Sequence, residues 1–126
     1  FIGVSVPNVL AEADLQKMAK DSVVFALANP DPEIDPEVAR RYAKVVATGR
    51  SDQPNQINNV LAFPGIFRGL LDSGSRKIDD EMLISVSKAI AECVNPNQLN
   101  NSYIIPTVFD SNIVKKVSEA VNSFLN

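Results

Sequence analysis

Residues 23–28 are a continuous apolar run, Val-Val-Phe-Ala-Leu-Ala, which is typical of a parallel strand covered on both faces. Pro30 and Pro32 follow it closely, and because proline cannot donate to a strand ladder, they predict that the strand ends there in a turn. Residues 1–5 and 45–48 are two further apolar segments that we interpret as strands. The chain therefore has three candidate strands, each followed by polar or turn-forming residues.

Helical patterns separate the three candidate strands. Residues 11–19 carry apolar side chains at helical spacing, and Asp35 followed by Pro36 is typical of an N-cap and a first helical position, here opening a helix to about residue 42. Strands and helices that alternate with short connections predict an α/β fold, here the C-terminal half of a Rossmann-like doubly wound parallel sheet. In such a sheet the carboxyl ends of the strands meet at one edge, where ligands bind.

The chain after the apolar segment at residues 60–69 is mainly helical. Pro64 predicts the start of one helix, Asp79 predicts the N-cap of a longer one, and residues 111–125 have the pattern of a last amphipathic helix. The side chains that we expect in the core of this part include Phe63, Phe67, Leu70, Leu71, Leu83, Cys93 and Phe109.

The length of 126 residues allows one domain with a sizeable core. We predict a single domain at residues 1–126, made of strand–helix units at 1–48, a loop at 49–69 and a mainly helical segment at 70–126. The chain begins with Phe1 inside a candidate strand, which suggests a piece of a longer polypeptide.

Composition excludes several classes of function. The chain has no histidine, which rules out a Ser-His-Asp or Cys-His mechanism, and its one cysteine rules out disulfides within the chain and cysteine-based zinc sites. A net charge of −3 without a long lysine or arginine run argues against a nucleic-acid partner. No apolar run approaches the roughly 18 residues of a membrane span, and no signal peptide is visible, so we expect a cytoplasmic protein without membrane contact.

Residues 49–59 are the most polar stretch, Gly-Arg-Ser-Asp-Gln-Pro-Asn-Gln-Ile-Asn-Asn, and they directly follow the third candidate strand. Amide side chains carry donors and acceptors and stay neutral at any pH, so they suit holding a polar ligand rather than moving its protons. Composition alone nevertheless favours an ordinary surface loop.

Residues 47–69 read A-T-G-R-S-D-Q-P-N-Q-I-N-N-V-L-A-F-P-G-I-F-R-G, and this stretch closely resembles the signature of the malic enzymes of the bacterial and archaeal type. The departures are small: Gln53 stands where an aromatic residue is usual, and Asp31 stands in place of a threonine. The resemblance implies a parent enzyme that oxidatively decarboxylates (S)-malate to pyruvate and CO2 with NAD or NADP and with Mg²⁺ or Mn²⁺. This chain would be the C-terminal part of its NAD-binding domain.

The resemblance also implies roles for individual residues. Asn29, in the motif F-A-L-A-N-P, and Asn59 would hydrogen-bond the substrate, whereas Asn58 would contact the nicotinamide cofactor. Val4 and Ser5 match positions on the adenosine-ribose side of the cofactor. From the local sequence alone, Asn29 is equally well a turn residue, and Asn58 and Asn59 could equally cap the segment that follows them.

Arg50 has two possible roles in the sequence. Its guanidinium could bind a substrate carboxylate or a cofactor phosphate, but an ion pair with Asp52 or Glu33 is the simpler interpretation. Asp52 has no second acidic residue at metal-ligand spacing, so we interpret it as structural.

The chain has no G-x-G-x-x-G turn, although this type of sheet calls for one. The malic enzymes carry that turn, the acid and base residues and the metal ligands upstream of the segment that matches Phe1. We therefore expect no catalytic and no metal-binding residue here, and the choice between NAD and NADP depends on upstream residues. The alternative is that the isolated chain is a non-catalytic nucleotide-binding or association module. An open edge strand at Phe1 favours a homo-oligomer, a dimer or larger.

Overall fold

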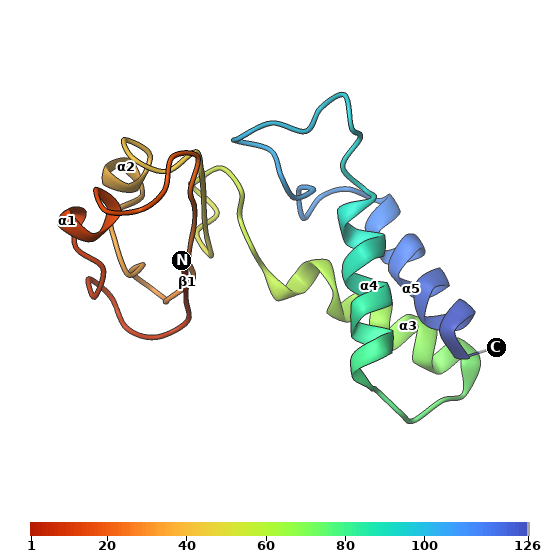
Figure 1. Cartoon of the computed structure of the whole chain (residues 1–126). Coiled ribbons are helices and arrows are strands. Elements are labelled where there is room, and N and C mark those ends of the chain that lie inside the picture. Colours follow the sequence, from red (N-terminus) through yellow and green to blue (C-terminus); the bar gives the residue numbers. More distant parts are fainter. Residues whose placement is uncertain (126) are drawn as a thin grey trace. The chain divides into compact units, whose positions relative to one another are not determined.

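The structure, a computed structural model, describes residues 1–125, with side chains to residue 124 (Figure 1). The chain divides into two compact units, Phe1–Ile57 with Asn100–Ile104, and Asn58–Leu99 with Ile105–Asn126. We call them the sheet unit and the helical unit. That residues 1–126 form a single domain stays a prediction.

The sheet unit contains three parallel strands in the order β1–β2–β3. They are β1 at Ile2–Gly3, β2 at Val23–Ala26 and β3 at Val45–Thr48, with Ile2 opposite Phe25. This arrangement confirms the predicted α/β fold and brings the carboxyl ends of the three strands to one edge.

Strands β1 and β2 are shorter than the apolar runs at residues 1–5 and 23–28 predict. The backbone amides of Ser5 and Ala28 donate to the carboxylate of Glu33, at 3.0 and 3.1 Å. A side chain thus takes the place of a strand partner at these two amides.

Two short helices, α1 at Glu12–Leu15 and α2 at Pro36–Ala39, connect the strands. Asp35 caps α2 as predicted, because its Oδ1 accepts a hydrogen bond of 2.7 Å from the amide of Glu37. Both helices end before the predicted limits of residues 19 and 42, and the chain continues in tighter turns with hydrogen bonds between residues three apart.

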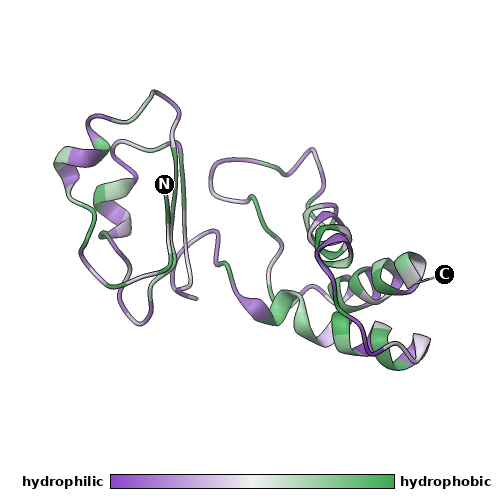
Figure 2. Ribbon diagram, turned by 60° about the horizontal axis from the view of Figure 1, so that its bottom comes forward, coloured by the Kyte–Doolittle hydropathy of each residue, from purple (hydrophilic) through white to green (hydrophobic). Residues whose placement is uncertain are grey.

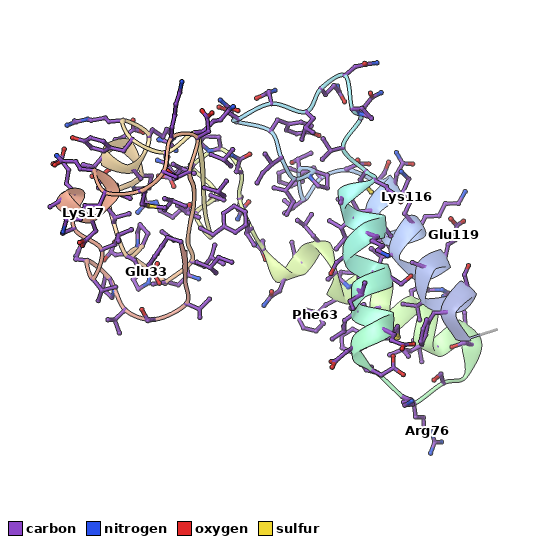
Figure 3. The ribbon with its side chains drawn as sticks, in the orientation of Figure 1. Lys17, Glu33, Phe63, Arg76, Lys116 and Glu119 are labelled. Atoms are coloured by element: carbon purple, nitrogen blue, oxygen red, sulfur yellow. The ribbon has the colours of Figure 1, made fainter. Side chains whose placement is uncertain are left out.

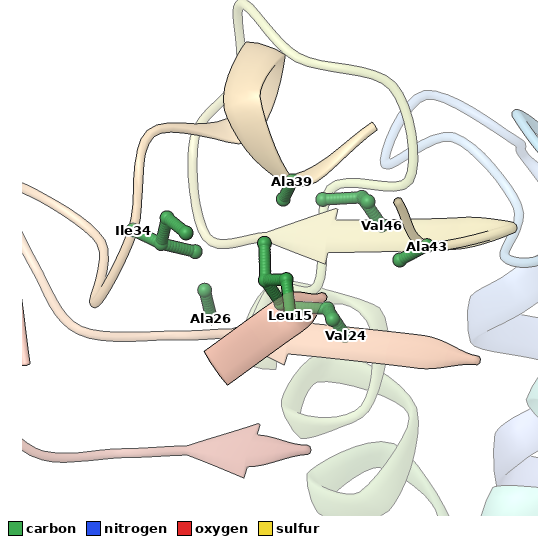
Figure 4. Close-up of a cluster of buried hydrophobic side chains, with 7 residues drawn as sticks. All are labelled: Leu15, Val24, Ala26, Ile34, Ala39, Ala43 and Val46. Atoms are coloured by element: carbon green, nitrogen blue, oxygen red, sulfur yellow. The ribbon is translucent and has the colours of Figure 1, made fainter. Parts of the chain in front are cut away.

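The core of the sheet unit lies between the strands and these two helices (Figure 4). Val24 is fully buried and Ala26 is 1% exposed, which shows that one face of β2 is closed to solvent. The buried side chains of this core are Leu15, Val24, Ala26, Ile34, Ala39, Ala43 and Val46.

The helical unit contains a short 3-10 helix, η1 at Asn59–Leu61, and three longer helices. These are α3 at Phe63–Ser73, α4 at Asp80–Ala91 and α5 at Asn112–Leu125. Asp79 caps α4 as predicted, accepting a hydrogen bond of 3.0 Å from the amide of Met82. Each helix carries both hydrophobic and hydrophilic residues (Figure 2), and the core residues are Leu61, Ile66, Met82, Val86, Ile113, Val117 and Val121.

Helices α3 and α5 approach closely at two glycines of α3. A Cβ atom at Gly65 would lie 2.5 Å from Cβ of Val117, and one at Gly69 would lie 2.6 Å from Cβ of Val121. The side of α3 that faces α5 therefore consists of residues without side chains, with Ile66 buried beside them.

The predicted packing of several large apolar residues in this unit is wrong. Phe63 and Phe67 stack on each other with ring centroids 5.9 Å apart, but their side chains are largely exposed. In sequence, Phe63, Phe67 and Leu71 fall on the same apolar side of α3 as Ile66 and Leu70, so the sequence does not reveal that the neighbouring glycine side faces α5. The exposed residues are Phe63, Phe67, Leu71, Leu83 and Phe109, with exposed fractions from 42% to 90%.

Candidate functional site at the carboxyl edge of the sheet

Glu33 organises the carboxyl edge of the sheet, although the sequence suggested for it only an ion pair with Arg50. Figure 3 labels Glu33 within the sheet unit. Its side chain is fully buried, and its two oxygens accept hydrogen bonds from the amides of Ser5, after β1, and Ala28, after β2. A Cβ atom at Gly3 would lie 2.5 Å from its Cδ, so β1 leaves room for this carboxylate. Glu33 therefore fastens the ends of two neighbouring strands to each other.

The carboxyl group of Glu33 is ionised at neutral pH. Burial raises the pKa of this carboxyl group. Hydrogen bonds from the amides of Ser5, Ala28 and Glu33 itself together lower it by more, so the resulting pKa lies below the usual value. None of the ion pairs among the described residues includes Glu33. Its buried charge is therefore stabilised by backbone amides and not by a cation.

Asn29 lies just beyond the end of β2, and its carboxamide rests against Gly49, just beyond the end of β3. A Cβ atom at Gly49 would lie 3.1 Å from Oδ1 and 3.2 Å from Nδ2 of Asn29. Asn29 is exposed, and within the described part of the chain its carboxamide has no hydrogen-bond partner. The predicted substrate residue thus lies against Gly49 and keeps its donors and acceptor available.

The polar loop after β3 closes on itself at its base. The amide of Ile57 donates to the carbonyl of Thr48 at 2.8 Å, and Nε2 of Gln56 donates to the carbonyl of Gly49 at 3.3 Å. The amide of Arg50 donates to Oγ1 of Thr48 at 3.1 Å. These bonds fix the backbone on both sides of Gly49.

Asn55 is a structural residue that sequence reasoning did not single out. It is 6% exposed and has a φ of 57°, a left-handed conformation that asparagine tolerates better than most residues. Its Nδ2 donates to the carbonyls of Val46 and Asn101, at 3.0 and 2.8 Å, and its Oδ1 accepts from the amide of Ile104 at 3.0 Å. This amide side chain holds the segment at 100–104 against β3, and both of its N–H donors are used within the fold.

Arg50 pairs with Asp52, which confirms the simpler of the two interpretations. Its Nε lies 2.8 Å from Oδ1 and its Nη2 lies 2.6 Å from Oδ2 of Asp52. The hydrogen bond from Arg50 lowers the pKa of Asp52. Both groups are exposed, so this pair contributes little to stability.

A cavity of about 230 Å³ opens beside Arg50 and is lined by residues that follow all three strands. Asn8 comes after β1, Asp31 and Asp35 come after β2, and Arg50 comes after β3. Its lining confirms that the segments after the three strands converge, as the parallel order of the sheet requires.

Val4 and Ser5, the predicted residues of the adenosine-ribose side, lie at the end of β1. Val4 is 78% exposed, and Ser5 is exposed although its backbone amide is held by Glu33. Both side chains are open to a ligand at the same edge of the sheet as Asn29.

Asn58 and Asn59 belong to the helical unit and lie at the start of η1. Oδ1 of Asn58 accepts a hydrogen bond of 3.0 Å from the amide of Val60, which confirms the capping role that its sequence also allows. Both residues are exposed. Over the described residues, neither Nδ2 of Asn58 nor the carboxamide of Asn59 has a hydrogen-bond partner.

Residues 1–125 contain no group of three or more histidine, cysteine, aspartate or glutamate side chains that could hold a metal ion. In the same part of the chain, none of the helices combines the length and the hydrophobicity that crossing a bilayer requires.

A family model described as the NAD-binding domain of malic enzyme matches residues 40–125. The chain belongs to the malic enzyme family. The NAD-dependent malic enzyme of Geobacillus stearothermophilus is 60% identical over 121 residues, which cover 96% of this chain and 25% of that protein. The NADP-dependent malic enzyme of Escherichia coli is 42% identical over 137 residues, which cover 96% of this chain and 18% of that protein.

The fold agrees with that of solved malic enzymes. The crystal structure of malic enzyme from Pyrococcus horikoshii superimposes with a TM-score of 0.93 at 45% identity, covering 98% of this chain and 29% of that one. The prediction that this chain has the Rossmann-like fold of an NAD-binding domain is thereby confirmed. The chain spans less than a third of the length of each of these malic enzymes.

Proposed function

We propose that this chain is the C-terminal part of the nucleotide-binding domain of an enzyme that oxidatively decarboxylates (S)-malate to pyruvate and CO2 with NAD or NADP. The names of the relatives support the reaction class and both cofactors. The observation that carries the proposal is the carboxamide of Asn29, which stands exposed at the carboxyl edge of the sheet against Gly49. Ligands of open α/β sheets bind at this edge.

Asn29 and Asn59 orient malate by hydrogen bonds to its carboxylate or hydroxyl groups. A neutral amide can donate and accept but does not take up a proton at working pH, so these residues hold the substrate and do not act as acid or base. Their availability supports this role, because within the described chain no other group occupies either carboxamide.

Val4, Ser5 and Asn58 contact the nicotinamide cofactor, which accepts a hydride when it is bound. The exposed side chains of Val4 and Ser5 and the uncommitted Nδ2 of Asn58 fit such a ligand. Mg²⁺ or Mn²⁺, which the family resemblance implies, does not fit the described residues of this chain, since no metal-ligand cluster exists among them. Its ligands belong to another part of the enzyme.

The decisive test is Asn59→Ala in the full-length enzyme that carries this chain. Loss of one preorganised donor is expected to remove roughly 2–4 kcal/mol of transition-state stabilisation, which is about 30- to 900-fold in kcat/KM for malate. Asn97→Ala, another exposed asparagine of the helical unit, is the control and should leave kcat/KM unchanged. Near-normal turnover and malate affinity in Asn59→Ala would remove Asn59 from the site.

A second function, a non-catalytic nucleotide-binding or association module, is favoured by the lack of a G-x-G-x-x-G turn in the sequence. An assay of the 126-residue chain with malate, Mn²⁺ and either cofactor separates the two functions. Turnover by this chain alone would refute the module.

We also propose that the enzyme is a cytoplasmic homo-oligomer. Strand β1 lies at the edge of the three-stranded order and pairs on one side with β2, and open strand edges favour association. A strictly monomeric mass of the enzyme in light scattering would contradict the oligomer.

A further inference from the structure

We propose that Gly49 is a positioning residue for malate recognition: its missing side chain provides the space in which the Asn29 carboxamide lies, so Gly49 determines where that amide meets the hydroxy-acid substrate. The inference rests on the proposed role of Asn29 in substrate binding.

The contact between Gly49 and Asn29 leaves no space for a side chain. A Cβ atom at position 49 would lie 3.1 Å from Oδ1, 3.2 Å from Nδ2 and 3.5 Å from Cγ of Asn29. The first two distances are tighter than ordinary carbon contacts in proteins, so any other residue at position 49 forces the carboxamide to move by a few tenths of an ångström.

Glycine is needed at position 49 for space and not for backbone conformation. Among the described residues the glycine with a positive φ is Gly74, so Gly49 has a backbone that alanine can adopt. The three atoms nearest to a side chain at position 49 all belong to the carboxamide of Asn29.

The backbone on both sides of this contact is held in place, which leaves the carboxamide as the part that yields. The carbonyl of Gly49 accepts from Gln56, and the amide of Arg50 is bound to Oγ1 of Thr48. On the other side, the amide of Ala28, directly before Asn29, is bound to Glu33. Gly49→Ala consequently displaces the carboxamide of Asn29 and leaves the surrounding backbone in place.

The full-length enzyme tests this with a double-mutant cycle of Gly49→Ala and Asn29→Ala. A shift of a few tenths of an ångström in a substrate-binding group is expected to lower kcat/KM for malate about tenfold, mainly through KM. In the Asn29→Ala background the same glycine replacement should change kcat/KM by less than about twofold, because the group that it displaces is gone. Ser51→Ala, at an exposed neighbouring position, is the matched control and should behave as wild type.

Two further readouts separate positioning from a structural role. The thermal midpoint and the NAD(P) affinity of Gly49→Ala, measured by cofactor fluorescence, should match wild type; if the midpoint falls, the double variant should restore it. An equal loss of activity from Gly49→Ala in both backgrounds, or unchanged malate kinetics in Gly49→Ala alone while Asn29→Ala is impaired, would overturn the inference. Unchanged malate kinetics in Asn29→Ala would instead refute the proposed function of Asn29.

Discussion

Glu33→Gln is the substitution that most directly tests how the carboxyl edge of the sheet is built. Glutamine has nearly the same shape as glutamate, so it creates no cavity, but it replaces one acceptor oxygen by an amino group. Both oxygens of Glu33 accept hydrogen bonds from backbone amides, at 3.0 Å from Ser5 and 3.1 Å from Ala28. In the variant, one of these two amides therefore faces another donor.

The size of the effect follows from burial. Glu33 is fully buried and its bond from Ala28 is buried, so the Ala28 amide cannot turn to water if it loses its acceptor, whereas the bond from Ser5 is part-buried. A hydrogen bond to a charged group contributes about 1.5–3 kcal/mol, and an unsatisfied buried donor costs about 1–3 kcal/mol. The two ranges partly describe the same loss, so they cannot simply be added. We therefore expect Glu33→Gln to lower the free energy of unfolding by about 2–4 kcal/mol at pH 7.

The dependence on pH has a definite sign. The folded-state pKa of Glu33 lies below its usual value, so the ionised form stabilises the fold fully above the unfolded-state pKa, about 4.3. This contribution is lost as the pH falls through the lower, folded-state pKa. Glutamine does not titrate, and the stability difference between wild type and Glu33→Gln is therefore constant above about pH 5.5 and shrinks below about pH 4.

Urea unfolding followed by circular dichroism between pH 3 and 7 measures this difference. Hydrogen exchange at the amides of Ser5 and Ala28 should accelerate in the variant, since both lie at the altered carboxyl group. Glu37→Gln serves as the control, because the side chain of Glu37 is 72% exposed and its ion pair with Arg40 contributes about 0–1 kcal/mol. If Glu33→Gln is as stable as this control, or if the difference between wild type and Glu33→Gln grows towards acid pH, the argument for a buried carboxylate held by backbone amides fails.

Two more substitutions test the scaffold around the site. Asn55→Ala removes three hydrogen bonds from a buried position with positive φ and should cost about 2–4 kcal/mol, with faster hydrogen exchange at the amide of Ile104; unchanged exchange there would contradict the role of Asn55 as a link. Gly69→Ala drives a methyl group into Val121 and should cost about 1–3 kcal/mol in urea unfolding, whereas the exposed Leu71→Ala should stay within about 0.5 kcal/mol, and equal effects would refute the close packing of α3 on α5.

The sheet and its helix starts could be predicted because their causes are local. Prolines at positions 30 and 32 end an apolar run, and Asp35 and Asp79 cap the helices that they precede. Parallel order then brings residues that are far apart in sequence, such as Ser5 and Asn29, to the same edge of the sheet. Local chemistry and one topological rule were sufficient for this part of the fold.

Contacts that depend on tertiary packing could not be predicted in the same way. The large apolar residues of α3 share one side of the helix, and the approach of α5 to the neighbouring Gly65 and Gly69 explains why Phe63 and Phe67 are exposed. Glu33 looks in sequence like one more acidic residue after a turn. Its role depends on two amides, one of which lies 28 residues away.

The asparagines show why amide content alone does not define a binding site. The amino group and the oxygen of Asn55 both form hydrogen bonds with backbone groups, and the oxygen of Asn58 caps η1. The carboxamides of Asn29 and Asn59 form no hydrogen bond with the described residues. A buried amide must be satisfied by the fold, because leaving it unpaired is costly, while an exposed amide can exchange water for a ligand at little cost. The same side chain thus serves as scaffold where it is buried and stays free to meet a ligand where it is exposed. That division assigns Asn55 to the architecture and leaves the carboxamides of Asn29 and Asn59 available for a polar ligand.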